Sequence, residues 1–423
     1  MKREIIRVDH LLGLGGAVRK PLNSSLMHSF EELVPYLSVG LVERLRQLGV
    51  HKPTPLQSEL LSNYFSHPRT DLFVKAAPGE GKTLGYVMAL MSSASPSFAT
   101  NPLAAALKKQ LILVPTAQLA SQIAQTITDL DPKTNTSFIL GGNCNFTEAS
   151  IVIAQPEALR TKLAQYGQSM LKGLETVVID EADALVKPLS QYASLARKRS
   201  RAQHPVPVLQ LLSEMWGMFD GDPIKKEMKP RLVVTSATLN KRTRQEFTAL
   251  DKKRDKSIMI GSSEGYKLAR KDTNQVTLNH TLLKDPESVS ELIEKFGRIF
   301  TAEERGLLLL PAEQSKTGAI SLLRAHFPEL KVGLLTRDGW KVDDDTHVHV
   351  ASDVDVRGLN LPGLDYVVIL DLPKSADHFI HMAGRVGRTF NPNGRIYTLL
   401  GTTVDLEKYT RMTAQLKLFS VPL

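Results

Sequence analysis

The stretch Ala76-Ala77-Pro78-Gly79-Glu80-Gly81-Lys82-Thr83 lies between an apolar run and a helical pattern. Residues 72–74 before it read Leu-Phe-Val, which predicts a buried strand. Residues 84–91 after it carry apolar side chains at helical spacing. A glycine-rich turn at this position lets successive backbone N–H groups point inward, beside the positive end of the helix. The stretch therefore predicts a strand, an anion-binding loop and a helix.

We call this stretch the phosphate loop, because its residue types suit a nucleotide. Lys82 is placed to reach the β- and γ-phosphates of ATP, and Thr83 to hold Mg²⁺. The strict pattern has a glycine where this chain has Ala76, and a glycine-rich turn without a ligand is the alternative interpretation. The other expected nucleotide contacts of the loop are Ala77, Pro78, Gly79, Glu80 and Gly81.

The composition is that of a globular protein with an anionic partner. With 423 residues the chain exceeds what one hydrophobic core usually serves, so we expect two domains or three. The net charge of +9 favours an anionic partner, although a solvated basic surface explains it equally well. The single cysteine, Cys144, excludes an internal disulfide framework and a multi-cysteine zinc site. No apolar run approaches the roughly 18 residues that span a bilayer, so we expect a soluble protein without membrane contact, and the single cysteine suits a reducing, intracellular compartment.

Short apolar runs alternate with helical segments along both halves of the chain. In the first half they lie at 72–74, 111–114, 138–140, 151–154, 177–179 and 232–235. A second module begins around Thr277, after a charged stretch at 251–274 that is typical of a linker. Its expected strands are 307–310, 331–335, 347–351, 366–370 and 395–399. This alternation predicts α/β domains with parallel sheets covered on both faces, whose ligands bind at the carboxyl ends of the strands.

Two polar motifs follow predicted strands of the first module. Asp180-Glu181-Ala182-Asp183 comes after 177–179, where Asp180 can hold the water shell of Mg²⁺ and Glu181 can deprotonate an attacking water. An acidic helix cap is the alternative. Ser236-Ala237-Thr238 follows 232–235, so its hydroxyls are expected at the same edge. These positions predict one nucleotide site built from several strand ends.

Upstream of the phosphate loop, residues 31–48 show helical spacing that ends at Gly49, and Gln57 lies near the start of a further helix. A glutamine amide can read an adenine edge, although most glutamines at helix starts are surface residues. In the second module, Ser352, Asp353 and the arginines Arg385 and Arg388 form a polar and basic set. Arginines three residues apart share a helix face and suit phosphate, whereas alone they would indicate a basic surface.

Together these motifs resemble the DEAD-box family of ATP-dependent RNA helicases, in the family's order and over residues 30–400. The resemblance implies two tandem RecA-like domains, each a parallel sheet with helices on both faces, which close over ATP, Mg²⁺ and single-stranded RNA. It divides the chain into an extension at 1–27, an ATP-binding domain at 28–262 with a basic insertion at about 190–230, a linker at 263–276, and a C-terminal helicase domain at 277–423.

The resemblance also implies roles for single residues. Phe30 stacks on adenine and Gln57 reads its edge, while Asp180 and Glu181 act on metal and water. His381 links the second domain to the acidic motif, and Arg385 and Arg388 reach the γ-phosphate. Further nucleotide contacts are implied for Asp353, Gly358 and Asn360, although Asn360 stands where the family has a ribose-binding acid. RNA contacts are implied for Pro115, Thr116, Gly142 and Ser352.

The departures from the family pattern lie in the parts that grip RNA. The family's Pro-Thr-Arg-Glu-Leu-Ala reads Pro-Thr-Ala-Gln-Leu-Ala at 115–120, and its Thr-Pro-Gly-Arg reads Gln-Pro-Glu-Ala at 155–158. Met382 replaces an arginine, and 334–352 is too short for the family's Gln-x-x-Arg helix. The insertion adds the basic residues Arg197, Lys198, Arg199, Arg201, Lys225, Lys226 and Lys229, which suit either phosphate binding or a solvated surface.

The sequence thus predicts an RNA-dependent ATPase that remodels RNA or ribonucleoprotein. We expect a monomer, alone or within a ribonucleoprotein particle, that acts on single-stranded or structured RNA, ribosomal RNA included. Residues 357–360 and 372–375 also resemble the fungal mitochondrial branch that assists ribosome assembly, which favours a mitochondrial location. The alternatives are an RNA-binding assembly factor that uses ATP as a clamp with little unwinding, and a purely structural partner of a larger particle.

Overall fold

The computed structural model describes residues 29–33, 36–94, 108–134, 136–140, 149–186, 194–217, 229–250, 257–261, 276–284, 289–335, 345–356, 359, 361, 363–386, 394–416, 418 and 420–422. The chain forms two compact units, the first made of residues 1–76 and 80–261 and the second of residues 77–79 and 262–423. We call them unit 1 and unit 2 in chain order.

Within the described residues, unit 1 contains a seven-stranded parallel sheet with the order β3-β4-β2-β5-β6-β1-β7. Its strands are β1 (Asp71–Lys75), β2 (Lys109–Leu113), β3 (Thr136–Ile139), β4 (Ile151–Ala154), β5 (Leu174–Ile179), β6 (Arg231–Ser236) and β7 (Ser257–Ile260). Side chains of the central strands are buried on both faces of the sheet. This double burial explains why the strands appear in the sequence as continuous apolar runs.

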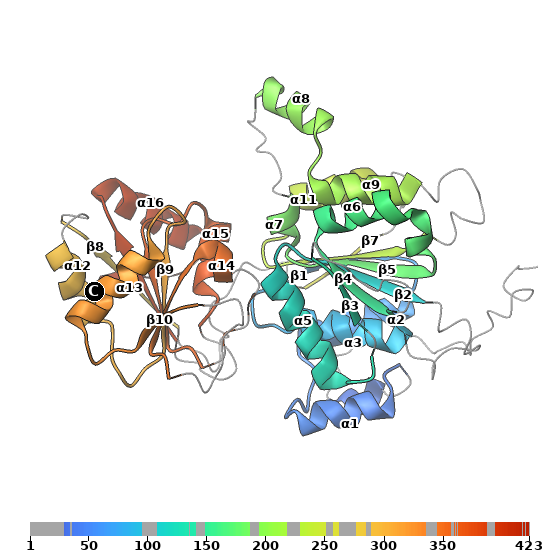
Figure 1. Ribbon diagram of the computed structural model, residues 1–423, viewed down its shortest axis with the longest axis horizontal. Helices are drawn as coiled ribbons and strands as arrows, with labels where there is room; N and C mark the ends of the chain where they lie inside the picture. The colour runs from blue at the N-terminus through green and yellow to red at the C-terminus, as the bar shows by residue number, and fades with distance from the viewer. Residues whose placement is uncertain are drawn as a thin grey trace, which may run out of the picture. The chain divides into compact units, whose positions relative to one another are not determined.

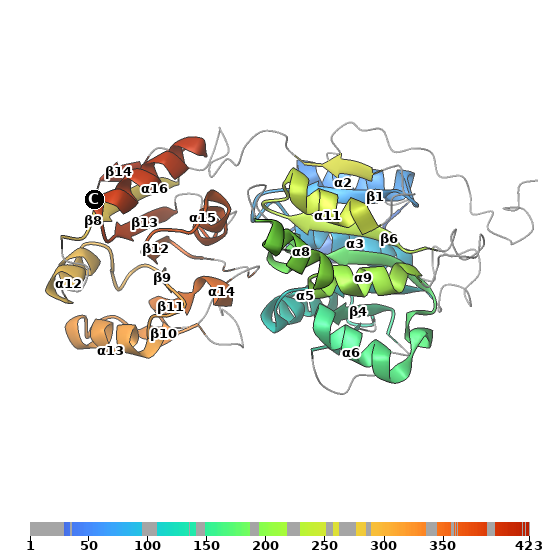
Figure 2. The same cartoon turned by 90° about the horizontal axis from the view of Figure 1, so that it is seen from above.

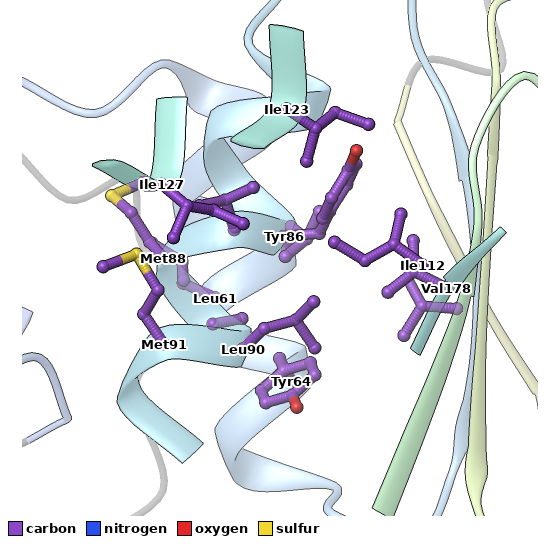
Figure 3. Close-up of a cluster of buried hydrophobic side chains, with 14 of the residues drawn as sticks. Leu61, Tyr64, Tyr86, Met88, Leu90, Met91, Ile112, Ile123, Ile127 and Val178 are labelled. Carbon is purple, nitrogen blue, oxygen red and sulfur yellow. The ribbon is translucent and has the colours of Figure 1, made fainter. Parts of the chain in front are cut away.

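Helices cover both faces of the sheet in unit 1 (Figure 1). The first face carries the 3-10 helix η2 (Phe30–Leu33) and the helices α1 (Val39–Gln47), α2 (Pro55–Ser66), α3 (Lys82–Ala94) and α5 (Ala117–Leu130). The second face carries α6 (Pro156–Tyr166), the 3-10 helix η4 (Gln168–Leu171), α7 (Ala182–Val186), α9 (Pro207–Gly217) and α11 (Lys241–Leu250). Figure 3 shows the first face, where Tyr86 of α3 packs with Ile123 of α5 against Ile112 and Val178 of the sheet.

Unit 2 repeats the plan, with seven described strands in the order β10-β11-β9-β12-β13-β8-β14, all parallel (Figure 2). The strands are β8 (Thr277–Leu282), β9 (Gly306–Leu310), β10 (Val332–Leu334), β11 (Val348–Ser352), β12 (Tyr366–Leu370), β13 (Arg395–Leu400) and β14 (Ser420–Pro422). Helices α12 (Val289–Gly297) and α13 (Lys316–His326) cover one face, and α14 (Asp353–Val356), α15 (Ala376–Ala383) and α16 (Thr403–Gln415) the other. Both units confirm the predicted α/β class.

The structure corrects three predictions about elements. The stretch 251–274, predicted as a linker, contains β7, which pairs with β1. Strands β8 and β14 were not predicted, and β14 has only three residues, which give too short a pattern. The helix predicted over 31–48 is two helices, since Ser38 accepts a hydrogen bond from the Leu41 N–H and so starts α1. Among the residues that the structure describes, none of the helices has the length and apolar character needed to cross a membrane.

A buried arginine ties the start of β6 to the end of α2. Arg231 is 4% exposed and donates to the carbonyls of Thr70 (2.8 Å), Tyr64 (2.7 Å) and His67. Its guanidinium carbon lies 4.2 Å from the centroid of the Tyr64 ring. A cation suits the carbonyl-rich end of a helix, so Arg231 fixes the turn that leads from α2 into β1.

Substitution Arg231→Met keeps the apolar stem and removes every donor, which leaves buried carbonyls unsatisfied. We expect unit 1 to lose about 3 kcal/mol of unfolding free energy. Urea denaturation followed by the fluorescence of Trp216, which is buried in unit 1, measures this loss. Arg46→Met, at an exposed arginine of unit 1 paired with Glu43, is the control and should change little. An unchanged midpoint for Arg231→Met would contradict the structural role.

Candidate functional site

The phosphate loop connects the carboxyl end of β1 to the first turn of α3. Gly79 and Gly81 both have φ of 85°, in the left-handed region that glycine adopts without strain. Lys82 is buried, and its ammonium donates to the Ala76 carbonyl at 2.7 Å. The loop thus curls around a cation at the positive end of a helix, an arrangement that suits phosphate.

Gln57 braces this loop from the start of α2. Its amide donates to the Gly81 carbonyl (3.2 Å) and its oxygen accepts from the Thr54 N–H (2.9 Å). The Thr54 hydroxyl donates to the Glu80 carbonyl at 2.9 Å and accepts from the Gln57 N–H. Gln57 is 3% exposed, and a methyl group at Gly81 would lie 2.3 Å from its nitrogen. The capping box of α2 therefore sets the shape of the phosphate loop.

The two residues predicted to contact adenine lie in buried surroundings. Phe30 is 2% exposed and packs in the core between the sheet and the first layer of helices. The amide of Gln57 retains one donor and one acceptor position beyond its bonds to Thr54 and Gly81. Stacking by Phe30 and edge recognition by Gln57 stay predictions.

Asp180, directly after β5, is a buried carboxylate held by hydroxyl donors. Its Oδ2 accepts from the Tyr86 hydroxyl at 2.8 Å, and its Oδ1 from the Thr235 hydroxyl at 2.5 Å and the Glu181 N–H at 3.0 Å. Burial, reinforced by this carboxylate, raises the pKa of the Tyr86 phenol well above its ordinary value. The phenol therefore stays protonated and donates.

The side chain of Thr83 lowers the pKa of the Tyr86 phenol, which offsets part of the rise caused by burial and Asp180. Tyr86 thus interacts with both Thr83 and Asp180, the two residues predicted to hold Mg²⁺. Hydroxyl and carboxylate oxygens are the hard ligands that Mg²⁺ prefers, so the donor set fits this ion. Tyr86 connects this donor set to the core, because the Tyr86 ring packs among the apolar side chains of α5 and the sheet (Figure 3).

The backbone of Glu181 is strained, with φ of 50°. Few residues other than glycine adopt this left-handed conformation, which costs on the order of 1–3 kcal/mol. The Ala184 N–H donates to the Glu181 carbonyl at 2.9 Å, so the chain turns at Glu181 directly into α7. Such strain is typical of functional positions, because it fixes a side chain where the site needs it.

Ser236 joins the acidic motif to the phosphate loop. Its hydroxyl donates to Asp183 and accepts from the Thr238 N–H at 3.1 Å, and its carbonyl accepts from the Ala76 N–H at 3.3 Å. Strand β6 lies between β1 and β5, so the phosphate loop and the acidic motif are two strand spacings apart, about 10 Å. The structure brings the three predicted motifs together at one edge of the sheet.

The predicted RNA contacts of unit 1 lie at helix starts beside this edge. Thr116 accepts from the Leu119 N–H at 3.3 Å and so starts α5, which leaves its hydroxyl proton available. Gln155, which replaces the family's threonine, donates to the Pro115 carbonyl at 3.1 Å and ties the starts of α5 and α6 together. Gly142 lies outside the described residues.

In unit 2, Ser352 at the end of β11 is held by Asp355. Its N–H and its hydroxyl donate to Asp355 Oδ2 at 2.8 and 2.6 Å, and Lys316 of α13 pairs with the same carboxylate. Burial alone would raise the pKa of Asp355, but the hydrogen bonds from Lys316 and Ser352 hold it below its ordinary value. The Ser352 proton is thus committed to an ionised partner, which leaves the hydroxyl only its lone pairs for RNA.

Asp353 pairs with His378 of α15, whose Nε2 lies 2.9 Å from Oδ2. His378 Nδ1 accepts from the Lys374 N–H at 3.1 Å, so the neutral ring carries its proton on Nε2 and donates to Asp353. Arg385 is 2% exposed and donates to the carbonyls of His381 (3.1 Å) and Leu359. The predicted sites Gly358, Asn360 and Arg388 lie outside the described residues.

Sequence reasoning missed several members of these networks: Thr54, Tyr86, Thr235, Lys316, Asp355 and His378. One signal was available, because Tyr86 follows Thr83 by three residues on the phosphate-loop helix and so shares its face. The partners in the other networks come from separate elements, which only the fold brings together.

Comparisons with known proteins match this arrangement. A family model described as DEAD/DEAH box helicase matches residues 54–247, and one described as helicase conserved C-terminal domain matches residues 338–390. The DEAD-box ATP-dependent RNA helicase 49 of Arabidopsis thaliana is 26% identical over 90% of this chain and 66% of its own length. The ATP-dependent rRNA helicase rrp-3 of Neurospora crassa is 26% identical over 91% of this chain and 70% of its own length. The chain thus spans about two thirds of the length of these relatives.

A solved structure of S. cerevisiae Dbp5 bound to RNA and ADP BeF3 has the same fold, with a TM-score of 0.70 and 16% identity. The likeness covers 94% of this chain and 96% of the Dbp5 chain. It extends over both seven-stranded sheets of the described residues and identifies each unit as a RecA-like domain.

Substitution Gln57→Glu places a carboxylate oxygen against the Gly81 carbonyl oxygen and should distort the phosphate loop. We expect ATP affinity to fall about tenfold, since an unfavourable buried polar contact costs about 1–3 kcal/mol. Titration with a fluorescent ATP analogue in the absence of RNA measures the change. Gln155→Glu, at the start of α6, is the matched control and should bind the analogue normally. Equal affinities for wild type and Gln57→Glu would show that the brace does not shape the loop.

Substitution Tyr86→Phe removes one donor from Asp180 and should weaken Mg²⁺ binding more than nucleotide binding. Loss of a group that orients a metal ligand typically costs 10–100-fold in metal affinity. We therefore expect analogue binding to need about ten times more Mg²⁺. Tyr64→Phe is the control, because Tyr64 lies in the same core and its hydroxyl is 3.1 Å from Thr176, away from Asp180. A Mg²⁺ requirement that changes equally in both variants would argue against the Tyr86–Asp180 link.

Proposed function

The chain belongs to the DEAD-box family of RNA helicases, and we propose that it is an RNA-dependent ATPase that remodels RNA or ribonucleoprotein. The observation that supports this most directly is the edge of unit 1 where three motifs meet. Ser236 bonds both the phosphate loop and Asp183, and Asp180 is bonded by Tyr86 and Thr235. A nucleotide bound there contacts groups that are already ordered, which is how a site lowers the barrier of phosphoryl transfer.

Each group at this edge has a distinct task in the proposed reaction. Lys82 and the N–H groups of the loop hold the β- and γ-phosphates, whose negative charge they neutralise. Asp180 and Thr83 would hold Mg²⁺, which would supply further neutralisation of phosphate charge when bound. The Glu181 carboxylate orients the attacking water and accepts its proton. Arg385 and Arg388 are proposed partners of the γ-phosphate.

RNA is the proposed substrate, and the helix starts of α5 and α6 are its proposed contacts in unit 1. Their N–H groups and the Thr116 hydroxyl can donate to phosphate oxygens. Ribosomal RNA is the proposed class of RNA, a proposal supported by the names of relatives such as the rRNA helicase rrp-3. The net charge of +9 suits such a partner.

An ATP-dependent RNA clamp with little unwinding is the second candidate. Two observations favour it, because Ser352, a predicted RNA contact, and Gln155, which stands where the family has a threonine of an RNA-grip motif, both use their polar groups within their own unit. The Ser352 hydroxyl donates to Asp355, and the Gln155 amide donates to the Pro115 carbonyl. We further propose that the protein acts as a monomer within a ribonucleoprotein particle and that it is located in mitochondria. Fractionation of cells that express the tagged protein tests this location.

Measuring ATP turnover by the pure protein with and without RNA tests the proposed function. We expect RNA to stimulate turnover in the wild type. Glu181→Gln should bind ATP and RNA but lose turnover by about 10²–10⁴-fold, because the amide cannot accept the water's proton. Glu214→Gln, at an exposed glutamate paired with Arg160, is the control and should be fully active.

The same measurements separate the candidates. RNA retention that depends on a non-hydrolysable ATP analogue, together with negligible turnover by the wild type, would support the clamp. Turnover by Glu181→Gln at the wild-type rate would remove Glu181 from the reaction. A wild type that neither hydrolyses ATP nor retains RNA would overturn both candidates.

A further inference from the structure

Helix α8 (Leu195–Gln203) concentrates positive charge on one short element. Positions 197–201 read Arg-Lys-Arg-Ser-Arg, and no Asp or Glu occurs from 195 to 213. The side chains of Arg197 and Arg199 are exposed, and the structure records no ion pair for either of them within the part of the chain that it describes. Arg197 and Arg199 are thus exposed cationic side chains without an anionic partner among the described residues.

Packing does not explain why this helix is present. Leu195, its only large apolar residue, is 71% exposed. Of the α8 residues with described burial, only Arg201 is partly buried, and the helix stands apart from those that cover the sheet (Figure 1). A helix of nine residues without a buried apolar face is marginal in water, and the like charges of Arg197 and Arg201, four residues apart, destabilise it further.

Among the described residues, Ser194 caps α8 and Arg201 attaches it to α7. The Ser194 hydroxyl accepts from the Arg197 N–H at 3.3 Å and so caps the start of the helix. Arg201 donates to the carbonyl of Val186 at 3.2 Å. Val186 is the last residue of α7, the short helix that begins directly after Glu181. Arg201 therefore anchors α8 to the element that starts at the acidic motif, while Arg197 and Arg199 remain exposed.

We propose that α8 binds the phosphate backbone of RNA, outside the contacts made by the motifs at the sheet edge. Guanidinium groups present forked donors that match phosphate oxygens, and a polyanion would remove the repulsion that destabilises the free helix. A protein partner fits less well, because stable protein interfaces have an apolar core and α8 offers Leu195 alone. Arg201 positions the helix, and Arg197 and Arg199 make the phosphate contacts. The inference rests on the proposed function, since it takes RNA as the substrate.

The test measures the RNA affinity of the full wild-type chain and its variants over a series of salt concentrations, without nucleotide. Fluorescence anisotropy of a labelled single-stranded RNA reports the binding. For Arg197→Ala/Arg199→Ala, the log–log salt slope should become shallower by about 1.4, from two contacts at about 0.7 each. From about 50 to about 200 mM salt, the ratio of wild-type to variant affinity should accordingly fall about sevenfold. Arg197→Lys/Arg199→Lys should keep the wild-type slope.

A matched control removes two positive charges elsewhere. Lys408 and Arg411 lie on the exposed surface of α16, where each has a carboxylate neighbour. Lys408→Ala/Arg411→Ala should leave the slope unchanged. Equal changes in both alanine variants would overturn the inference, because the effect would then follow net charge alone.

The remaining outcomes are also decisive. Wild-type slopes for Arg197→Ala/Arg199→Ala, in a chain whose wild type binds RNA, would overturn the role of α8 and leave the proposed function intact. Failure of the wild type to bind RNA at all would overturn the proposed function itself. Polyglutamate can be added as a competitor at the same concentration of negative charge as the RNA. If it displaces the labelled RNA from α8, an acidic protein partner would be favoured instead. ATP-analogue binding should be normal in every variant, and its loss in the Arg197→Ala/Arg199→Ala variant would show that the substitution disturbs the nucleotide edge.

Discussion

Asp180 is a buried carboxylate, and the candidate nucleotide site depends on how its charge is satisfied. A charge that is 2% exposed is costly unless donors surround it. Here the donors come from α3 through Tyr86, from β6 through Thr235 and from the backbone of Glu181. Because one carboxylate requires all three, the phosphate-loop helix, the central strand and the acidic motif are fixed relative to one another. The core of unit 1 and its proposed chemistry are therefore one structure, with the Tyr86 ring on the apolar side and its hydroxyl on the polar side.

Much of this could be predicted from the sequence, because strands buried on both faces show as continuous apolar runs. The strands at 151–154 and 366–370 have the predicted bounds, and the phosphate loop and acidic motif follow strands as expected. Strand β7 and the side-chain partners that were not predicted depend on tertiary contacts. Strand β7 is recognised through its pairing with β1 rather than through a strong pattern of its own. The brace between Gln57 and Gly81 joins residues 24 positions apart, and the pair of Lys316 and Asp355 joins residues 39 apart. A linear pattern does not indicate such partners.

The two units use their polar groups differently. In unit 1, hydrogen bonds at the sheet edge order backbone N–H groups and oxygens around a space suited to nucleotide phosphates. In unit 2, Asp353, Ser352 and Arg385 are engaged by His378, Asp355 and backbone carbonyls. Such internal bonds hold the strand ends of unit 2 in a defined shape, and a ligand that needs these donors must compete with them. In the basic helix α8, by contrast, the exposed side chains of Arg197 and Arg199 have no such internal partners among the described residues.

The left-handed backbone of Glu181 places thermal stability and the proposed catalytic activity in conflict. Glycine accepts φ of 50° without the steric cost that a side chain incurs. Selection for heat resistance alone would therefore favour glycine at this position and discard the carboxylate that the proposed reaction requires. A glutamate that persists here marks selection for activity, so sequences of close relatives that carry glycine at this position would identify copies that have given up hydrolysis.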